Sequence, residues 1–287
     1  MRFMRISNKS VAVTLAVTFI CALASSSYGT LLFEEGFNYT AGNGLSTSGG
    51  WLGGGATVLT INSGNLTYPN LADTSPSGND LKLTSGVSAS TDYTNFSGTA
   101  VTGGTVYFSF LLTPTALPTA NQEVADLLPS GSTGLLGSTA PLGIYVGQQT
   151  AGVQYKIGVR HGLSGATYAS NSSLTLNSTN FMVVAYTFNP STGDDTVSLW
   201  INPTPGGSPP TADVSFGNPL LTDAVNLQVV GIKAQSAATQ GNWIFDAFRI
   251  GDTWGDVTPT TVPEPSTFAL MGVGLGLMVA VIRRRRS

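Results

Sequence analysis

The sequence is poor in the residues on which many enzyme sites depend. Its single cysteine, Cys21, lies in an N-terminal apolar segment, so the rest of the chain has no cysteine for a disulfide. His161 is the only histidine. Zinc sites built on these ligands and Cys/His nucleophile pairs are therefore excluded. Without such cross-links, the body of the chain must be stabilised by a hydrophobic core.

Basic side chains are also scarce between the two chain ends. The body, residues 30–262, carries five Lys and Arg against fourteen Asp and Glu, which gives a net charge of −9. The five are Lys82, Lys156, Arg160, Lys233 and Arg249. The whole-chain charge of −3 conceals this acidic body, because the other basic residues lie in the two ends. Nucleic acid is excluded as a partner, since no basic patch is available to neutralise phosphates.

The N-terminal segment has the pattern of a secretory signal peptide. Three basic residues precede an apolar run over residues 11–23. Ala22-Leu23-Ala24 offers an A-x-A cleavage site, which assigns residues 1–24 to the signal peptide. Cleavage after Gly29 is a later alternative. The pattern predicts export of the protein.

The C-terminal segment repeats this arrangement in the opposite direction. An uncharged apolar run extends from Phe268 to Ile282 and reaches about 17 residues with the two residues before it. As a helix it would span about 25 Å, the lower limit for a hydrocarbon core. The four arginines after it would stay on the cytoplasmic side; they are Arg283, Arg284, Arg285 and Arg286. We therefore predict a transmembrane helix with an arginine cluster over residues 266–287.

A short motif, Val262-Pro263-Glu264-Pro265, precedes the apolar run. Its two prolines exclude helix and keep a Pro/Thr-rich linker, residues 258–265, extended. Motif, apolar run and arginine cluster together resemble the PEP-CTERM sorting signal of Gram-negative bacteria. The resemblance implies processing by an exosortase-type membrane protease and transient anchoring in the inner membrane. It also implies a final place in the cell envelope, at the outer surface or in the extracellular matrix; a plain single-pass anchor is the alternative.

The body shows short runs of Val, Leu, Tyr and Phe separated by Gly, Asn, Ser and Pro, which predict β-strands. The predicted strands are Leu31–Phe37, Thr57–Ile61, Asn65–Tyr68, Leu81–Leu83, Thr105–Leu112, Leu142–Val146, Val153–Val159, Phe181–Asn189, Thr196–Ile201, Ala212–Phe216, Leu227–Ile232 and Trp243–Ile250. One helical turn is predicted over Asn121–Leu128. About a dozen short strands in one domain predict an all-β, two-sheet antiparallel sandwich over residues 30–257.

Three segments of the body, Leu31–Phe37, Thr196–Pro203 and Phe245–Gly251, resemble LamG-like domains of the concanavalin A-like jelly-roll class. The resemblance implies that the first and last strands pair and bring the two ends of the domain together. Such domains often accompany PEP-CTERM signals.

No catalytic residue is assigned. Glycoside hydrolysis needs two carboxyl groups facing each other across a cleft, and alternating acids on one strand, E-x-D-x-E, are its signature. That spacing is absent. Glu34 and Glu35 are adjacent and point to opposite faces of a strand, and Glu123 and Asp126 are assigned to a loop.

No cofactor or metal ligand is assigned either, although calcium at Asp194 and Asp195, with Asn189 completing the shell, is an alternative to a hydrogen-bonded turn. Asp246 is interpreted as a structural carboxylate. The four tryptophans are interpreted as core residues, with stacking on sugars as the alternative; they are Trp51, Trp200, Trp243 and Trp254.

The sequence therefore predicts an exported, non-catalytic protein of the cell envelope or extracellular matrix. Its partners would be an exosortase-type protease, the membrane before processing and an extracellular polysaccharide. A carbohydrate-binding module that uses an exposed tryptophan and a glycoside hydrolase of the concanavalin A-like class are the alternatives.

Overall fold

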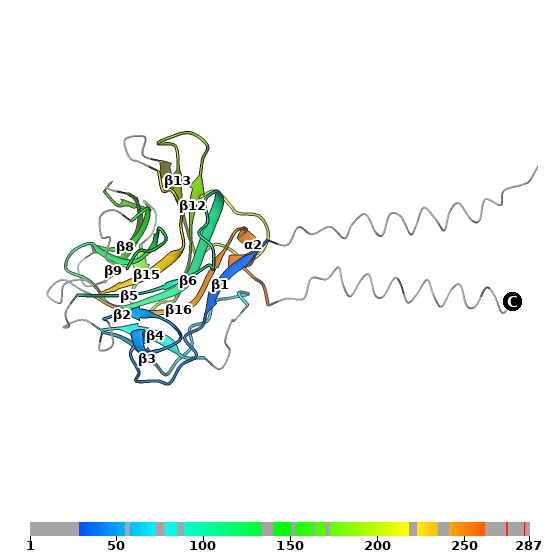
Figure 1. The fold of residues 1–287 in the computed structure, drawn as a ribbon. Coiled ribbons are helices and arrows are strands. Elements are labelled where there is room, and N and C mark those ends of the chain that lie inside the picture. The colour runs from blue at the N-terminus through cyan, green and yellow to red at the C-terminus, as the bar shows by residue number, and fades with distance from the viewer. Residues whose placement is uncertain are drawn as a thin grey trace, which may run out of the picture.

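Strands make up nearly all the regular structure of the described residues. The structure, a computed structural model, describes residues 29–54, 58–72, 78–84, 89–133, 140–150, 153–162, 165–169, 173–217, 223–234 and 241–261, with the single positions 274 and 284. Among the described residues between 29 and 261, two short helices occur, η1 (Leu45–Thr47) and α2 (Trp254–Val257). The strands form two antiparallel sheets that pack face to face (Figure 1), which confirms the predicted all-β sandwich.

The first sheet, sheet A, has eight strands. They are β1 (Leu31–Glu35), β3 (Leu59–Asn62), β4 (Asp80–Leu83), β6 (Gly104–Ala116), β12 (Asn180–Phe188), β13 (Thr196–Ile201), β14 (Val214–Gly217) and β16 (Asn242–Gly251). Their order across the sheet is β14-β13-β12-β6-β16-β4-β3, and β1 also pairs with β16.

The second sheet, sheet B, also has eight strands. They are β2 (Leu52–Gly53), β5 (Ser90–Asn95), β7 (Gln122–Leu128), β8 (Leu142–Thr150), β9 (Gln154–His161), β10 (Thr167–Tyr168), β11 (Leu174–Thr175) and β15 (Val229–Ala234). Their order is β10-β9-β8-β7-β15-β5-β2, and β11 also pairs with β9.

The main core lies between the two sheets, where alternate residues of each strand point inward. Phe248 is central to it, because its ring lies edge-on at 5.1 Å from the rings of both Phe37 and Phe108. A second apolar layer covers the outer face of sheet A, where Trp254 of α2 packs against Tyr107 and Trp200. The middle of sheet A is therefore buried on both faces.

Most of the predicted strands are present, with ends shifted by a few residues. Two local predictions were wrong. Asn65–Tyr68 is not a strand, because the amide of Leu66 donates to the carboxylate of Asp246 rather than to a neighbouring strand. Asn121–Leu128 is not a helical turn; residues 122–128 form β7, a central strand of sheet B.

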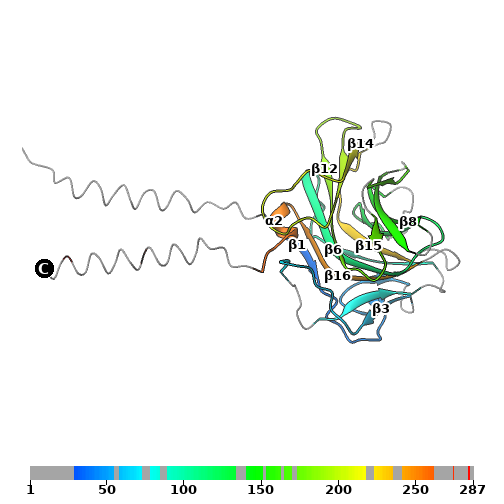
Figure 2. The same ribbon diagram turned by 180° about the vertical axis from the view of Figure 1, so that it is seen from behind.

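The two ends of the sandwich meet, as the jelly-roll resemblance implied. β1 pairs with β16, with Glu35 opposite Phe248 and Leu31 opposite Gly251. β1 and α2 lie side by side at one end of the molecule in both views (Figures 1 and 2). Pairing of the first and last strands therefore places both ends of the body on the same side.

The first residues of the predicted linker are held against the body. Thr258 is buried and its hydroxyl donates to the carbonyl of Trp254. The amide of Ala72 donates to the carbonyl of Pro259 at 2.8 Å, and the amide of Thr261 donates to Asn70 at 3.2 Å. The body therefore contacts the chain up to the residue before Val262.

Glu35 fixes the turn that follows β1. Its carboxylate accepts hydrogen bonds from the amide of Phe37 at 2.7 Å, the hydroxyl of Tyr39 at 2.6 Å and the indole of Trp51 at 3.0 Å. Phe37 has a φ of 50°, which is strained for a bulky residue. The charge-assisted bond from its amide to Glu35 stabilises this conformation. The same carboxylate also binds Tyr39 and Trp51, so it connects all parts of the turn.

We expect Glu35→Ala to lower the free energy of unfolding by about 3 kcal/mol, because three donors, two of them buried, lose their acceptor. The neighbouring Glu34→Ala is the matched control. Glu34 faces outward and pairs with Arg249, and its loss should cost about 1 kcal/mol or less. Urea denaturation of both variants measures the difference, and equal losses would contradict the role of Glu35.

Candidate functional site

The carboxylates of Glu123 and Asp126 lie on the same face of β7, the face that points away from the main core. Residues three apart on a regular strand would face opposite sides. A β-bulge corrects the spacing: Glu123 is opposite Tyr145, Ala125 is opposite Ile144 and Asp126 is opposite Gly143. The bulge therefore brings two acids together that a plain alternation would separate.

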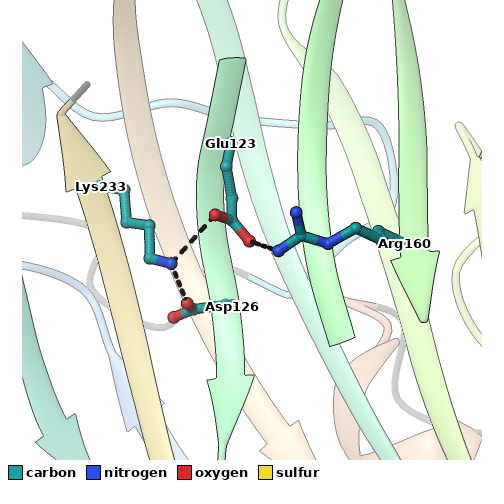
Figure 3. A network of polar contacts seen from close by, with 4 residues as sticks. All are labelled: Glu123, Asp126, Arg160 and Lys233. Atoms are coloured by element: carbon teal, nitrogen blue, oxygen red, sulfur yellow. Dashed lines mark hydrogen bonds and ion pairs between the residues drawn. The ribbon is translucent and has the colours of Figure 1, made fainter. Parts of the chain in front are cut away.

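Two cations pair with these acids, one from the adjacent strand β15 and one from β9 on the far side of β8 (Figure 3). Lys233 Nζ of β15 lies 2.5 Å from Asp126 Oδ2 and 3.0 Å from Glu123 Oε2. Arg160 Nη2 of β9 lies 3.0 Å from Glu123 Oε1. Glu123 thus bridges the two cations. All four side chains are buried, with Glu123 2% and Asp126 0% exposed.

Glycines make room for this network. The Glu123–Arg160 pair crosses β8, and a Cβ added at Gly143 would lie 2.5 Å from Glu123 Oε1 and 3.5 Å from Arg160 Nη2. A Cβ at Gly231 of β15 would collide with Asp126 Oδ1. Glycine inside a strand weakens it, but here it permits the close approach of a buried side chain.

Burial changes the protonation of the cluster. It raises the pKa of Asp126 to about 7, with Lys233 acting in the opposite direction and Glu123 adding to the rise. Asp126 Oδ1 has no hydrogen-bond partner among the described residues. Burial also raises the pKa of Tyr145, whose ring lies 4.9 Å from the Arg160 guanidinium. Burial therefore favours the protonated form of Asp126 more than it would be favoured in water.

The arrangement has some features of an acid–base pair, but a substrate in the solvent cannot reach the two carboxyl groups. Both acids bind the same ammonium, so their nearest oxygens lie at most about 5.5 Å apart, a limit that permits the spacing of retaining glycosidases. A protonated Asp126 could donate a proton near pH 7. However, both acids are buried, so neither presents an oxygen to a substrate in the solvent.

Sequence reasoning missed this cluster. Glu123 and Asp126 were assigned to a loop. The E-x-D-x-E spacing assumes a strand without a bulge, so it cannot detect two acids that a bulge aligns. One signal was available: Gly143 and Gly231 stand inside apolar strand patterns, where glycine suggests a bulge or a close approach.

The predicted turn after β12 contains a second acidic group. Ligand oxygens of Asp194, Asp195 and Asp223 lie within 4.8 Å of one another. Asp195 is buried and accepts hydrogen bonds from the hydroxyl of Tyr186 at 2.6 Å and the amide of Asn189 at 2.7 Å. Asp223, which the sequence did not indicate, accepts the amide hydrogens of Gly193 and Asp195. These bonds are those of an acid-capped turn.

His161 lies next to this turn, with its ring 5.6 Å from that of Tyr186. Burial lowers the pKa of His161, while the charges of Asp195 and Asp223 act in the opposite direction. The neutral form of the imidazole is therefore favoured, and the side chain packs as a core residue.

The other candidate ligands are structural. The four tryptophans are buried, with exposures between 1% and 8%, so the predicted core role is confirmed and an exposed tryptophan for sugar stacking is excluded. Asp246 is buried and accepts hydrogen bonds from the amides of Ala247 and Leu66. Arg249, which stands near it in the sequence, pairs with Glu34 instead.

A cavity of about 260 Å³ lies on the outer face of sheet A. Its walls are mostly apolar and include Leu66, Leu71, Leu111 and Ala247. Tyr68 is the only titratable side chain among its lining residues, and burial raises its pKa. This cavity therefore offers no pair of acids or bases for catalysis.

Of the predicted sorting residues, Arg284 is described and is exposed. Val262, Pro263, Glu264, Pro265, Arg283, Arg285 and Arg286 lie outside the described residues, as does most of the predicted transmembrane helix and all of residues 1–24. Among the helices that the structure describes, none is long and apolar enough to cross a membrane.

Comparison with known proteins assigns the C-terminal segment. The chain is an all-β sandwich protein with a sorting signal: residues 261–286 match the family model of the PEP-CTERM protein-sorting motif. This motif implies an exported protein that is sorted to the cell envelope or surface and processed by an exosortase, a membrane protease. No curated protein matches the sequence.

Solved structures resemble the body at low identity. The globular domain of T. cruzi calreticulin is 15% identical over 78% of this chain and 88% of its own, with a TM-score of 0.46. The carbohydrate recognition domain of Emp47p is 7% identical over 80% and 99%, with a TM-score of 0.47. The endo-1,3-beta-glucanase of Streptomyces sioyaensis is 11% identical over 79% and 98%, with a TM-score of 0.44. At this level of similarity none of these activities transfers to the chain.

The raised pKa of Asp126 predicts a pH dependence of stability. The folded carboxyl binds its proton more tightly than the unfolded one, so this contribution is full below about pH 3.8 and is lost as the pH rises through about 7. Asp126→Asn cannot titrate. We therefore expect the unfolding free energy of the wild type, relative to this variant, to fall by about 2–4 kcal/mol between pH 4 and 8.

Urea denaturation across this pH range measures the effect. Asp213→Asn is the control, because Asp213 is exposed and lies outside the cluster. A difference between wild type and Asp126→Asn that stays constant with pH would contradict the raised pKa.

Proposed function

We propose that the body is a non-catalytic domain of the concanavalin A-like class that the sorting signal delivers to the cell envelope or extracellular matrix of a Gram-negative bacterium. Before processing, the C-terminal apolar segment anchors it in the inner membrane. After processing, the body makes structural or adhesive contacts in the envelope or matrix, with extracellular polysaccharide as its partner.

One observation carries the non-catalytic role: the paired acids of sheet B are buried in a network with two cations. Glu123 and Asp126 each contact Lys233, and Glu123 also contacts Arg160. A catalytic carboxyl must reach the substrate directly or through one water. Acids that are 2% and 0% exposed and paired with cations favour a structural role.

The proposal needs no cofactor. The carboxylates of the turn after β12 already accept hydrogen bonds from the backbone of that turn and from Tyr186. The four indoles are buried and offer no exposed ring for a sugar to stack on.

Glycoside hydrolysis is the second candidate, and a specific observation favours it. The bulge in β7 places two carboxyl groups on one face, close together, and burial raises the pKa of Asp126 to about 7. This is the pairing of an ionised and a protonated acid that such chemistry uses.

Activity assays distinguish the two candidates. We expect the purified exported protein to release no reducing ends from β-glucans, xylans or alginates between pH 5 and 8. Glu123→Gln and Asp126→Asn are the diagnostic variants, with circular dichroism to verify folding. Turnover by the wild type that either folded variant loses would establish the hydrolase and overturn the non-catalytic proposal.

The sorting signal predicts removal of the C-terminus. We expect intact-mass analysis of the exported protein to find no residues from 268–287. Replacing Val262–Pro265 by alanines should block processing and leave the full tail attached in the membrane fraction. Thr260→Ala is the control, because residue 260 lies just outside the matched motif. A wild-type protein that still ends at Ser287 would contradict processing and leave the plain anchor.

A further inference from the structure

At the N-terminal end of the body, the backbone amide of Thr30 donates to a side-chain carboxylate rather than to a backbone carbonyl. The amide nitrogen of Thr30 lies 2.7 Å from Oδ1 of Asp252, while the carbonyl of Thr30 accepts the amide of Asp252 at 3.2 Å. Along the rest of β1 the backbone partners are residues of β16, beginning with Leu31 opposite Gly251. Thr30 is therefore the last residue of this ladder, and its nitrogen meets a negative charge.

A carboxylate is a better partner for an ammonium than for an amide. A backbone amide has one hydrogen and no net charge, whereas a free α-amino group has three hydrogens and a positive charge near neutral pH. Charge-assisted bonds between such groups are stronger than neutral ones. Asp252 thus stands where a chain that begins at Thr30 would need a counter-ion.

The residue before Thr30 is glycine, and the structure is crowded around it. A Cβ at Gly29 would collide with the side chains of Thr253 and Asp256. Asp256 accepts hydrogen bonds from the amide and hydroxyl of Thr253, so its carboxylate is fixed beside this position. A second negative charge therefore lies close to the start of β1.

The sequence at this point also fits cleavage. Signal peptidases require small residues one and three positions before the cut, and Gly29 and Ser27 occupy these positions. The alternative site after Ala24 meets the same requirement, so sequence alone leaves both open. The position of Asp252 is what distinguishes them.

We propose that the signal peptide is removed between Gly29 and Thr30, and that the new α-ammonium of Thr30 forms an ion pair with Asp252. Hydrolysis of this peptide bond leaves the carboxylate on Gly29 and the amino group on Thr30, with one water consumed. The mature body then begins with its first paired residue. The inference rests on the proposed export of the protein.

Mass spectrometry of the exported full chain tests the cut. The expected N-terminal peptide begins at Thr30. Gly29→Leu should lower the fraction of protein that begins at Thr30 at least tenfold. A mature protein that begins at Ser25 would overturn this inference and leave export intact. Retention of residues 1–24 would overturn both the inference and export.

The ion pair has its own test. The groups near the new ammonium are Asp252 and, beside Gly29, Asp256; Arg249, which pairs with Glu34, also donates to the carbonyl of Asp256. Asp252 raises the pKa of the ammonium, so its contribution is full below about pH 7.7 and is lost at higher pH. Asp252→Asn keeps an oxygen acceptor but removes the charge.

We expect Asp252→Asn to lower the Tm of the exported protein by about 1–3 °C at pH 6.5 and by much less at pH 10. Asp213→Asn, at another exposed acid, is the control. A Tm difference that is the same at both pH values would overturn the ion pair, because an amide at Thr30 does not titrate.

Discussion

The pairing of β16 with three other strands is the constraint on which the rest of the structure depends. β16 is hydrogen-bonded to β1, β4 and β6, and it supplies Phe245, Phe248 and Ile250 to the core. It is also the last strand of the body, so sheet A closes only when both ends of the domain come together. Pairings between residues so distant in sequence carry a high entropic cost, and the buried aromatic surface of β16 offsets it.

This closure also determines where the chain enters and leaves the body. Thr30 and Thr258 lie beside the same small helix, α2, because β1 and β16 are neighbours. The segments that carry the two processing signals therefore join the sandwich at one end. Hydrogen bonds between Ala72 and Pro259 and between Thr261 and Asn70 extend this attachment to Thr261, the first residue of the matched sorting motif.

In sheet B, the desolvation cost of buried charges is set against the ion pairs that these charges form. Each ion that leaves water costs several kcal/mol, and the ion pairs among Glu123, Asp126, Arg160 and Lys233 offset this cost only while all four are present. Glycines at 143 and 231 provide the space. The acids are buried together with the cations that pair with them. The network therefore stabilises one arrangement of the sheet and exposes no reactive group to solvent.

The sequence by itself determined the fold class, most of the strands and the sorting motif, because these depend on local patterns: alternation, turn residues, an apolar run and a cluster of arginines. It did not reveal β5, whose side chains are mostly polar, or β7, which is buried on both faces and shows no alternation. Only the tertiary structure brought Glu123 and Asp126 together with Lys233 and Arg160, because a bulge and strand neighbours far apart in sequence decide that contact. Tertiary structure likewise placed Asp252 beside Thr30, since residues 222 positions apart meet only when the first and last strands pair.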